Sequence, residues 1–119
     1  MSSLREQLRA LHAQPGVGAV IAAGRDGLLI DHAPDGVVGD AEHLAALAPG
    51  LVAAADRLAD AHAAGVLRSV VVETADGILI ALPVSPDVVI LAAIDPAHAA
   101  AAAAIGHVRG EHAALGAAV

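Results

Sequence analysis

The sequence predicts an α/β (α+β) domain whose elements follow the order α-β-β-α-β-β-β-α. Two observations predict this class. Short apolar runs are separated by Gly- and Asp-rich turns at hairpin spacing, which is typical of paired strands. Three longer segments repeat apolar residues at helical spacing. The 119 residues suit one domain with a modest core, so we expect a single domain over residues 1–119.

A helix and a β-hairpin open the chain. The motif SLRE at residues 3–6 fits a capping box, and three leucines follow at the spacing of one helical face: Leu4, Leu8 and Leu11. The Gln-Pro-Gly sequence at residues 14–16 ends this helix. Strands are expected over residues 17–23 and 28–32, joined by the Gly-Arg-Asp-Gly turn.

A long helix follows a loop at residues 33–39. Asp40 is expected to cap this helix, and Gly65 is a favourable residue just after its end. Side chains at helical spacing form one stripe along it: Leu44, Leu47, Leu51, Ala55, Leu58 and His62. Pro49 is expected to kink the helix or to split it near Ala48, because proline removes a backbone donor.

Three further strands and a last helix complete the predicted elements. The strands are expected over about residues 67–74, 78–83 and 88–94, with hairpin-length turns between them. The Asp95-Pro96 pair is a favourable helix start, and six consecutive alanines follow it. A sheet with helices on both faces is the compact way to bury these elements.

Composition excludes several classes of partner. Alanine supplies 32 of the 119 residues and aromatic residues are absent, which favours closely packed layers over an internal ligand cavity. The formal net charge is −7 and all six basic residues are arginine, so we expect no nucleic-acid partner. No apolar run is long enough to span a bilayer, so we expect no membrane insertion and a cytoplasmic protein.

The chemistry-bearing residues predict neither an enzyme nor a cofactor. Without lysine and cysteine the chain has no P-loop, Schiff-base lysine or thiolate nucleophile. Its few hydroxyl residues occupy caps, turns and ordinary strand positions, and none lies in a nucleophile-elbow sequence. Gly16-Val17-Gly18 precedes a strand instead of following one, which contradicts a dinucleotide fingerprint. We therefore expect no catalytic residue and no cofactor.

The histidines and acids also favour structural roles. His107 and Glu111 lie four residues apart on the predicted last helix, which is more typical of a solvated polar pair than of a metal site. His62, His98 and His112 fall within apolar stripes, and we expect no metal there. Glu73 ends an apolar strand, where it is either a guard of an exposed sheet edge or a contact to a partner.

The order and spacing of these motifs resemble the roadblock / dynein light chain family. The resemblance rests on the hairpin GRDGLLI, the helix start DAEHLAAL and the hairpin VVVE-x-x-x-G-x-L-x-x-x-P-V, and it covers residues 4–115. It is strongest to bacterial members, among them gliding-motility regulators that partner small Ras-like GTPases and roadblock proteins of actinobacterial GTPase operons. It implies a five-stranded antiparallel sheet with the long helix on one face and the terminal helices on the other.

The resemblance also implies a homodimer in which third strands pair edge to edge and long helices pack together. The residues that it places at this interface, or in the core beside it, are Leu44, Leu47, Leu51, Leu58, Leu67, Ser69, Val71 and Glu73. Independently, the long helix carries more apolar circumference than one sheet face can bury, so a second partner is expected. Arg25, Arg57 and Arg68 are not assigned as catalytic arginines.

The function expected from these observations is a non-enzymatic homodimeric interaction module that regulates or partners a small Ras-like GTPase. Two alternatives stay open at this point. One is a scaffold or adaptor of the dynein light chain type that has no preference for a nucleotide state. The other is a small-molecule sensory domain built on the same platform.

Overall fold

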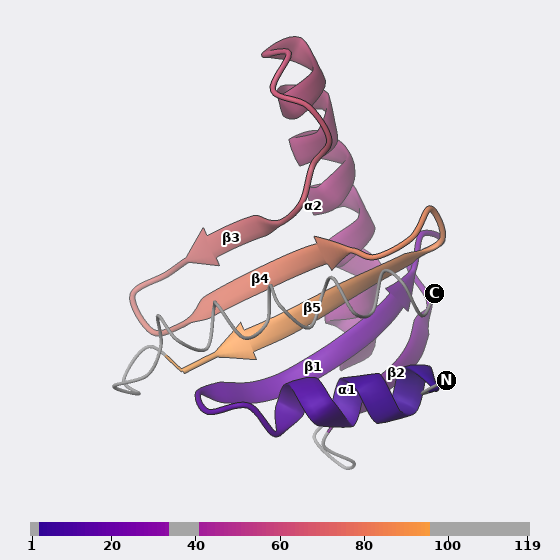
Figure 1. Cartoon of the computed structure of the whole chain (residues 1–119), viewed down its shortest axis with the longest axis vertical. Coiled ribbons are helices and arrows are strands. Elements are labelled where there is room, and N and C mark those ends of the chain that lie inside the picture. The colour runs from indigo at the N-terminus through magenta and orange to yellow at the C-terminus, as the bar shows by residue number, and fades with distance from the viewer. Residues whose placement is uncertain (1–2, 34–40, 96–119) are drawn as a thin grey trace.

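Five antiparallel strands form one sheet in the order β2-β1-β5-β4-β3 (Figure 1). The computed structural model describes residues 3–33 and 41–95. The strands are β1 (Val17–Gly24), β2 (Leu29–Ala33), β3 (Val70–Glu73), β4 (Ile78–Pro83) and β5 (Val88–Ile94). This topology confirms the predicted fold class and the five-stranded antiparallel sheet.

Two helices cover opposite faces of the sheet: α1 (Leu4–His12) and α2 (Ala41–Ala61). The face toward α1 includes the aligned residues Val20, Ala92 and Ile80. The face toward α2 includes their chain neighbours Ile21, Leu91 and Ala81, because successive side chains of a strand point to opposite faces. The predicted helix after Asp95 lies outside the described residues.

The start of α1 is fixed by its cap and by one ion pair. The Ser3 hydroxyl accepts a hydrogen bond from the Glu6 N–H at 3.2 Å, as the capping-box pattern predicts. The Arg5 guanidinium donates two hydrogen bonds of 3.1 Å to the carboxylate of Asp31 in β2. This bidentate pair lowers the pKa of Asp31, and it joins α1 to the edge of the sheet.

The β1–β2 turn brings the sheet into close contact with α2. Gly27 has a φ of 84°, and a Cβ at this position would lie 3.5 Å from the Ala46 Cα. Glycine is required here for the left-handed conformation, and an added Cβ would make an ordinary contact with α2. A bulge between Ala22 and Ala23 shifts the register opposite β2.

The third strand is shorter than predicted. It was expected over about residues 67–74, but only Val70–Glu73 pair with β4. In this register Pro83 would lie opposite residue 68, and proline has no N–H to donate to that neighbour. The ladder stops at Val70, which leaves the residues before it as a connection.

The long helix is continuous through Pro49, so the predicted split near Ala48 is wrong. Buried residues lie on both sides of the proline, at Ala45 and at Val52, and both pack against the same sheet face. This packing holds the two halves in one helix although the proline removes a backbone hydrogen bond. Within the described part of the chain, no helix is both long and apolar enough to cross a membrane.

Candidate interaction surface

The long helix buries alanines and exposes leucines. Its buried residues follow helical spacing and are nearly all small: Ala41, Ala45, Ala48 and Val52. The flank beside this stripe carries Leu44 and Leu51, which are half-buried, and Leu47, which is 59% exposed. Small side chains let a helix lie close to a sheet, so Leu44 and Leu51 pack at the margin of the α2-side core while Leu47 lies mostly outside it.

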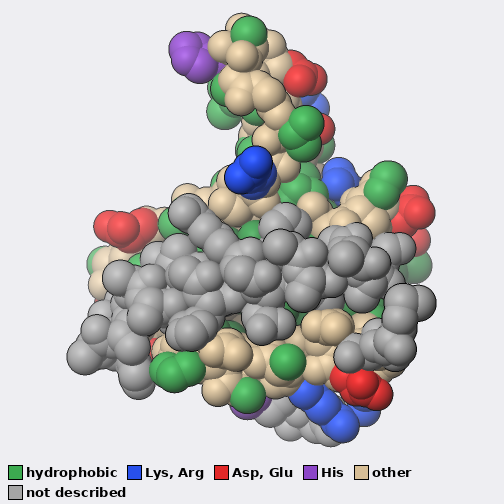
Figure 2. All heavy atoms as spheres, viewed as in Figure 1, with side chains coloured by type: hydrophobic (Ala, Val, Ile, Leu, Met, Phe, Trp, Pro, Cys, Tyr) green, Lys and Arg blue, Asp and Glu red, His purple; other side chains and the backbone are tan. Residues whose placement is uncertain are grey.

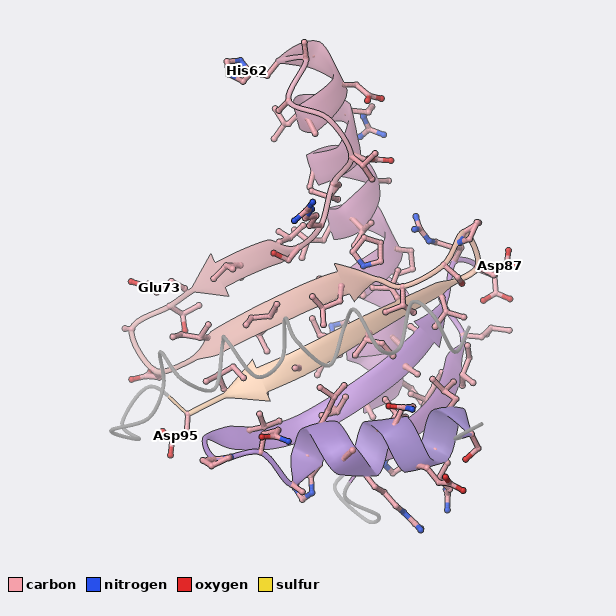
Figure 3. The ribbon with its side chains drawn as sticks, viewed as in Figure 1. His62, Glu73, Asp87 and Asp95 are labelled. Carbon is pink, nitrogen blue, oxygen red and sulfur yellow. The ribbon has the colours of Figure 1, made fainter. Side chains whose placement is uncertain are left out.

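The second half of α2 extends past the β3 edge of the sheet (Figure 1). We call residues 53–66 the arm: the end of α2 and the segment that returns toward β3. No residue of the arm is buried, and Leu58 and Val66 are 73% and 91% exposed. Figure 2 shows the arm standing clear of the rest of the molecule, and Figure 3 places His62 at its tip. His62 is thus exposed and lies outside the monomer's core.

The edge of β3 is available for pairing. Among the described residues β3 pairs with β4 alone, and it ends the strand order. The Thr74 N–H donates to the Gly77 carbonyl at 2.8 Å, which continues the β3–β4 ladder. Because backbone groups alternate along an antiparallel strand, those of Val71 and Glu73 point away from β4. Figure 3 shows Glu73 at the end of β3 farther from the arm.

The opposite edge, β2, is protected against pairing. The register shift opposite Ala22 and Ala23 leaves Ile30 outside the ladder and half exposed. Arg5 reaches from α1 to Asp31 in the same strand. Bulges and charged residues are the devices that keep sheet edges from adding strands. Of the two edges, β3 therefore presents the more adhesive one.

The sequence-predicted interface residues do not share one face. Leu44, Leu51 and Leu67 are half-buried against the α2-side core, whereas Leu47 and Leu58 are exposed along the flank of the helix. Half-buried Ser69 directly precedes β3. Val71 is 43% exposed and, like Glu73, belongs to the α1 side of the sheet, since Val71 lies opposite Ile80.

Three exposed apolar residues were missed from the sequence. Val66 follows Gly65 in the arm, while Leu28 and Ile30 belong to the β1–β2 hairpin. The only sequence signal that Leu28 is exposed was its place directly after a turn glycine, Gly27, which has a positive φ in the structure. Leu28 is 67% exposed, and its neighbour Gly27 lies close to Ala46 in the first half of α2.

A shallow hollow of about 210 Å³ lies at the base of the arm. Val52, Val66 and Leu67 contribute apolar lining, and the β4–β5 turn forms another wall. Arg25 and Asp56 add charge, and the Arg25 guanidinium donates to the Ser85 carbonyl at 3.3 Å. Within residues 3–33 and 41–95 no three His, Asp or Glu side chains gather as metal ligands. His98, His107, Glu111 and His112 lie outside those ranges.

Comparisons with known proteins agree with this architecture. The Roadblock/LC7 domain model matches residues 4–95. A solved Roadblock/LC7 domain from Streptomyces avermitilis is 25% identical, with a TM-score of 0.76, and the match covers 99% of this chain and 95% of that chain. MglB from Myxococcus xanthus is 20% identical, with a TM-score of 0.76 and coverage of 99% and 100%.

A third solved structure, an MglB described as having a tetrameric arrangement, is 17% identical with a TM-score of 0.77. The match covers 98% of this chain and 90% of that chain. No curated protein matches the sequence. The two MglB likenesses concern the fold.

Proposed function

Because the chain belongs to the Roadblock/LC7 domain family, we propose that it is a non-enzymatic homodimer that partners or regulates a small Ras-like GTPase. Membership of this family and the likeness to MglB folds support a protein-interaction role. The observation that carries the proposal is the apolar surface that the described monomer leaves uncovered along α2 and the arm. Exposed apolar surface of this kind marks interaction sites.

The proposed dimer joins two copies at their β3 edges. A copy that adds its β3 to this edge lies below the overhanging arm, which already extends past the sheet on that side (Figure 1). Leu58 and Val66 would then be covered by the second copy, and the half-buried Leu51 would lose its remaining exposure. Burial of such side chains contributes about 1.5–3 kcal/mol each when it is complete. Leu44, Leu67, Ser69, Val71 and Glu73 belong to the same proposed interface.

A second apolar region lies at the other end of the leucine flank. Leu58 lies eleven positions after Leu47, a rise of about 16 Å along a helix. The Gly27–Ala46 contact brings the β1–β2 turn to this part of α2, and the residues that follow the two contacting positions, Leu28 and Leu47, are both exposed. We assign Leu47 and Leu28 to the GTPase surface, because a dimer joined at β3 leaves them uncovered.

The test is to mix the purified chain with a candidate small Ras-like GTPase and to measure co-elution of the two proteins with each nucleotide. We expect a complex in one nucleotide state, with Leu47→Asp losing the complex but keeping the dimer. Co-elution in neither state overturns this partnership. Equal co-elution in both states favours the adaptor alternative, in which the nucleotide has no influence.

A further inference from the structure

We propose that a second copy pairs with β3 in a single register, in which Val71 lies opposite its own counterpart and Glu73 lies opposite Ser69. This inference rests on the homodimer of the proposed function. It adds the register of the pairing and the residue that selects it. Glu73 then acts as a specificity residue of the interface.

The backbone of β3 is prepared for this contact. The hydrogen bond from the Thr74 N–H to the Gly77 carbonyl fixes which residues face β4. By alternation, Val70 and Val72 direct their backbone groups toward β4, and Val71 directs its N–H and carbonyl to the open edge. Two copies of Val71 placed opposite each other exchange both hydrogen bonds, which makes a closed pair on a twofold axis.

Symmetry restricts the registers that are possible. Residues directly opposite in an antiparallel pair have their side chains on the same sheet face. Val70 belongs to the α2 side and Val71 to the α1 side, so these two cannot lie opposite each other. The twofold axis must therefore pass through one residue. Within the strand the candidates are Val70, Val71, Val72 and Glu73.

Glu73 distinguishes these candidates. An axis at Glu73 places two carboxylates opposite each other, which is destabilising. An axis at Val72 puts Glu73 against Val71, an apolar side chain that cannot donate a hydrogen bond to the carboxylate. An axis at Val70 would put Glu73 opposite Leu67, but Leu67 packs against the α2-side core whereas Glu73 belongs to the α1 side, so these two cannot lie opposite each other.

An axis at Val71 satisfies every opposing pair. Val70 lies opposite Val72, so branched apolar side chains pack across the interface. Ser69 lies opposite Glu73, and the Ser69 hydroxyl can donate to the carboxylate twice, once on each side of the axis. Glu73 thus combines the two roles that its position suggested: it guards the edge against other registers and contacts the partner in the correct one.

The natural absence of cysteine makes this register measurable. Single variants Val70→Cys, Val71→Cys and Val72→Cys are oxidised in the full chain, and disulfide-linked dimer is followed on non-reducing gels. Directly opposite Cα atoms of a hydrogen-bonded pair are about 5.5 Å apart, within the range of a disulfide. We expect Val71→Cys to cross-link about tenfold faster than the others, whose counterparts lie about 8 Å apart.

The outcomes separate the register from the dimer. Faster cross-linking at Val70→Cys or Val72→Cys overturns the register, while a dimeric mass without cross-linking at any position overturns pairing through β3. A monomeric mass of the full chain in solution overturns the proposed homodimer itself. The role of Glu73 has its own test: adding Glu73→Val should raise cross-linking of Val72→Cys several-fold. An unchanged rate overturns the selecting role of Glu73.

Discussion

Leu47 and Ala48 are neighbours in α2, yet Ala48 is 3% exposed against the sheet and Leu47 is 59% exposed. At these two positions α2 therefore buries the smaller side chain, Ala48, and exposes the larger one, Leu47. A monomer alone would gain more by burying leucine, because apolar burial scales with area. The exposure of Leu47 is explained when a partner protein buries it.

Leu58→Asp should dissociate the dimer, because it places a charge in the arm where the second copy is proposed to pack. Leu28→Asp is the matched control, since Leu28 is similarly exposed but lies in the β1–β2 hairpin. Light scattering should give a monomeric mass for the first variant and a dimeric mass for the second. A dimer that survives Leu58→Asp, with unchanged circular dichroism, would exclude the arm from the interface.

Ala48→Leu should destabilise the fold by about 1–3 kcal/mol, because it inserts extra methyl groups between α2 and the sheet. Leu47→Ala, one residue away, should change the unfolding free energy of the separated monomer by less than about 0.5 kcal/mol. Urea unfolding followed by far-ultraviolet circular dichroism measures both, in the Leu58→Asp background so that dimerisation does not contribute. Equal effects at the two positions would contradict the burial pattern.

Gly27→Ala should destabilise the chain by about 1–2 kcal/mol, because a residue with a side chain is strained at a φ of 84°. Gly50→Ala makes the same chemical change inside α2, where an added Cβ meets nothing within 4 Å. That variant should stabilise the helix by about 0.5–1 kcal/mol. The two variants should thus shift the melting temperature in opposite directions, and a shared direction would argue against the left-handed conformation at Gly27.

The Arg5–Asp31 pair should contribute about 0.5–1 kcal/mol at neutral pH, since Arg5 is half exposed. Arg5 holds the pKa of Asp31 below its ordinary value of 3.8 in the folded chain. The contribution is therefore present above about pH 4 and is lost as the pH falls through the lowered pKa. Arg5→Gln should destabilise the chain at pH 7 and progressively less as the pH falls below 3.8. In an Asp31→Asn background this pH-dependent difference should vanish.

The sequence was sufficient to predict the strands at Ile78–Pro83 and Val88–Ile94, which have the predicted bounds. Turn residues on each side fixed those bounds. It was not sufficient to decide which face of α2 is buried, because alanines and leucines both recur at helical spacing. Hydrophobicity alone favours leucine for the core, whereas α2 buries Ala41, Ala45, Ala48 and Val52 against the sheet.

Other features depended on tertiary contacts that a pattern does not contain. Pro49 was expected to kink α2 or to split it near Ala48, and packing at Ala45 and Val52 keeps it a single helix. The shortened β3 follows from where its partner β4 ends, and the exposure of Leu58 follows from the length of α2 relative to the sheet. Which of the proposed interface residues share a face was therefore not predictable from the sequence.

The molar mass of the full chain in solution decides whether the chain forms the proposed homodimer. Light scattering with refractive-index detection suits a chain without aromatic residues. At micromolar concentration the proposed dimer should have twice the 11.6 kDa mass of one chain. A mass of 11.6 kDa across that concentration range would contradict the dimer, because Leu58, Val66 and the β3 edge would then remain uncovered.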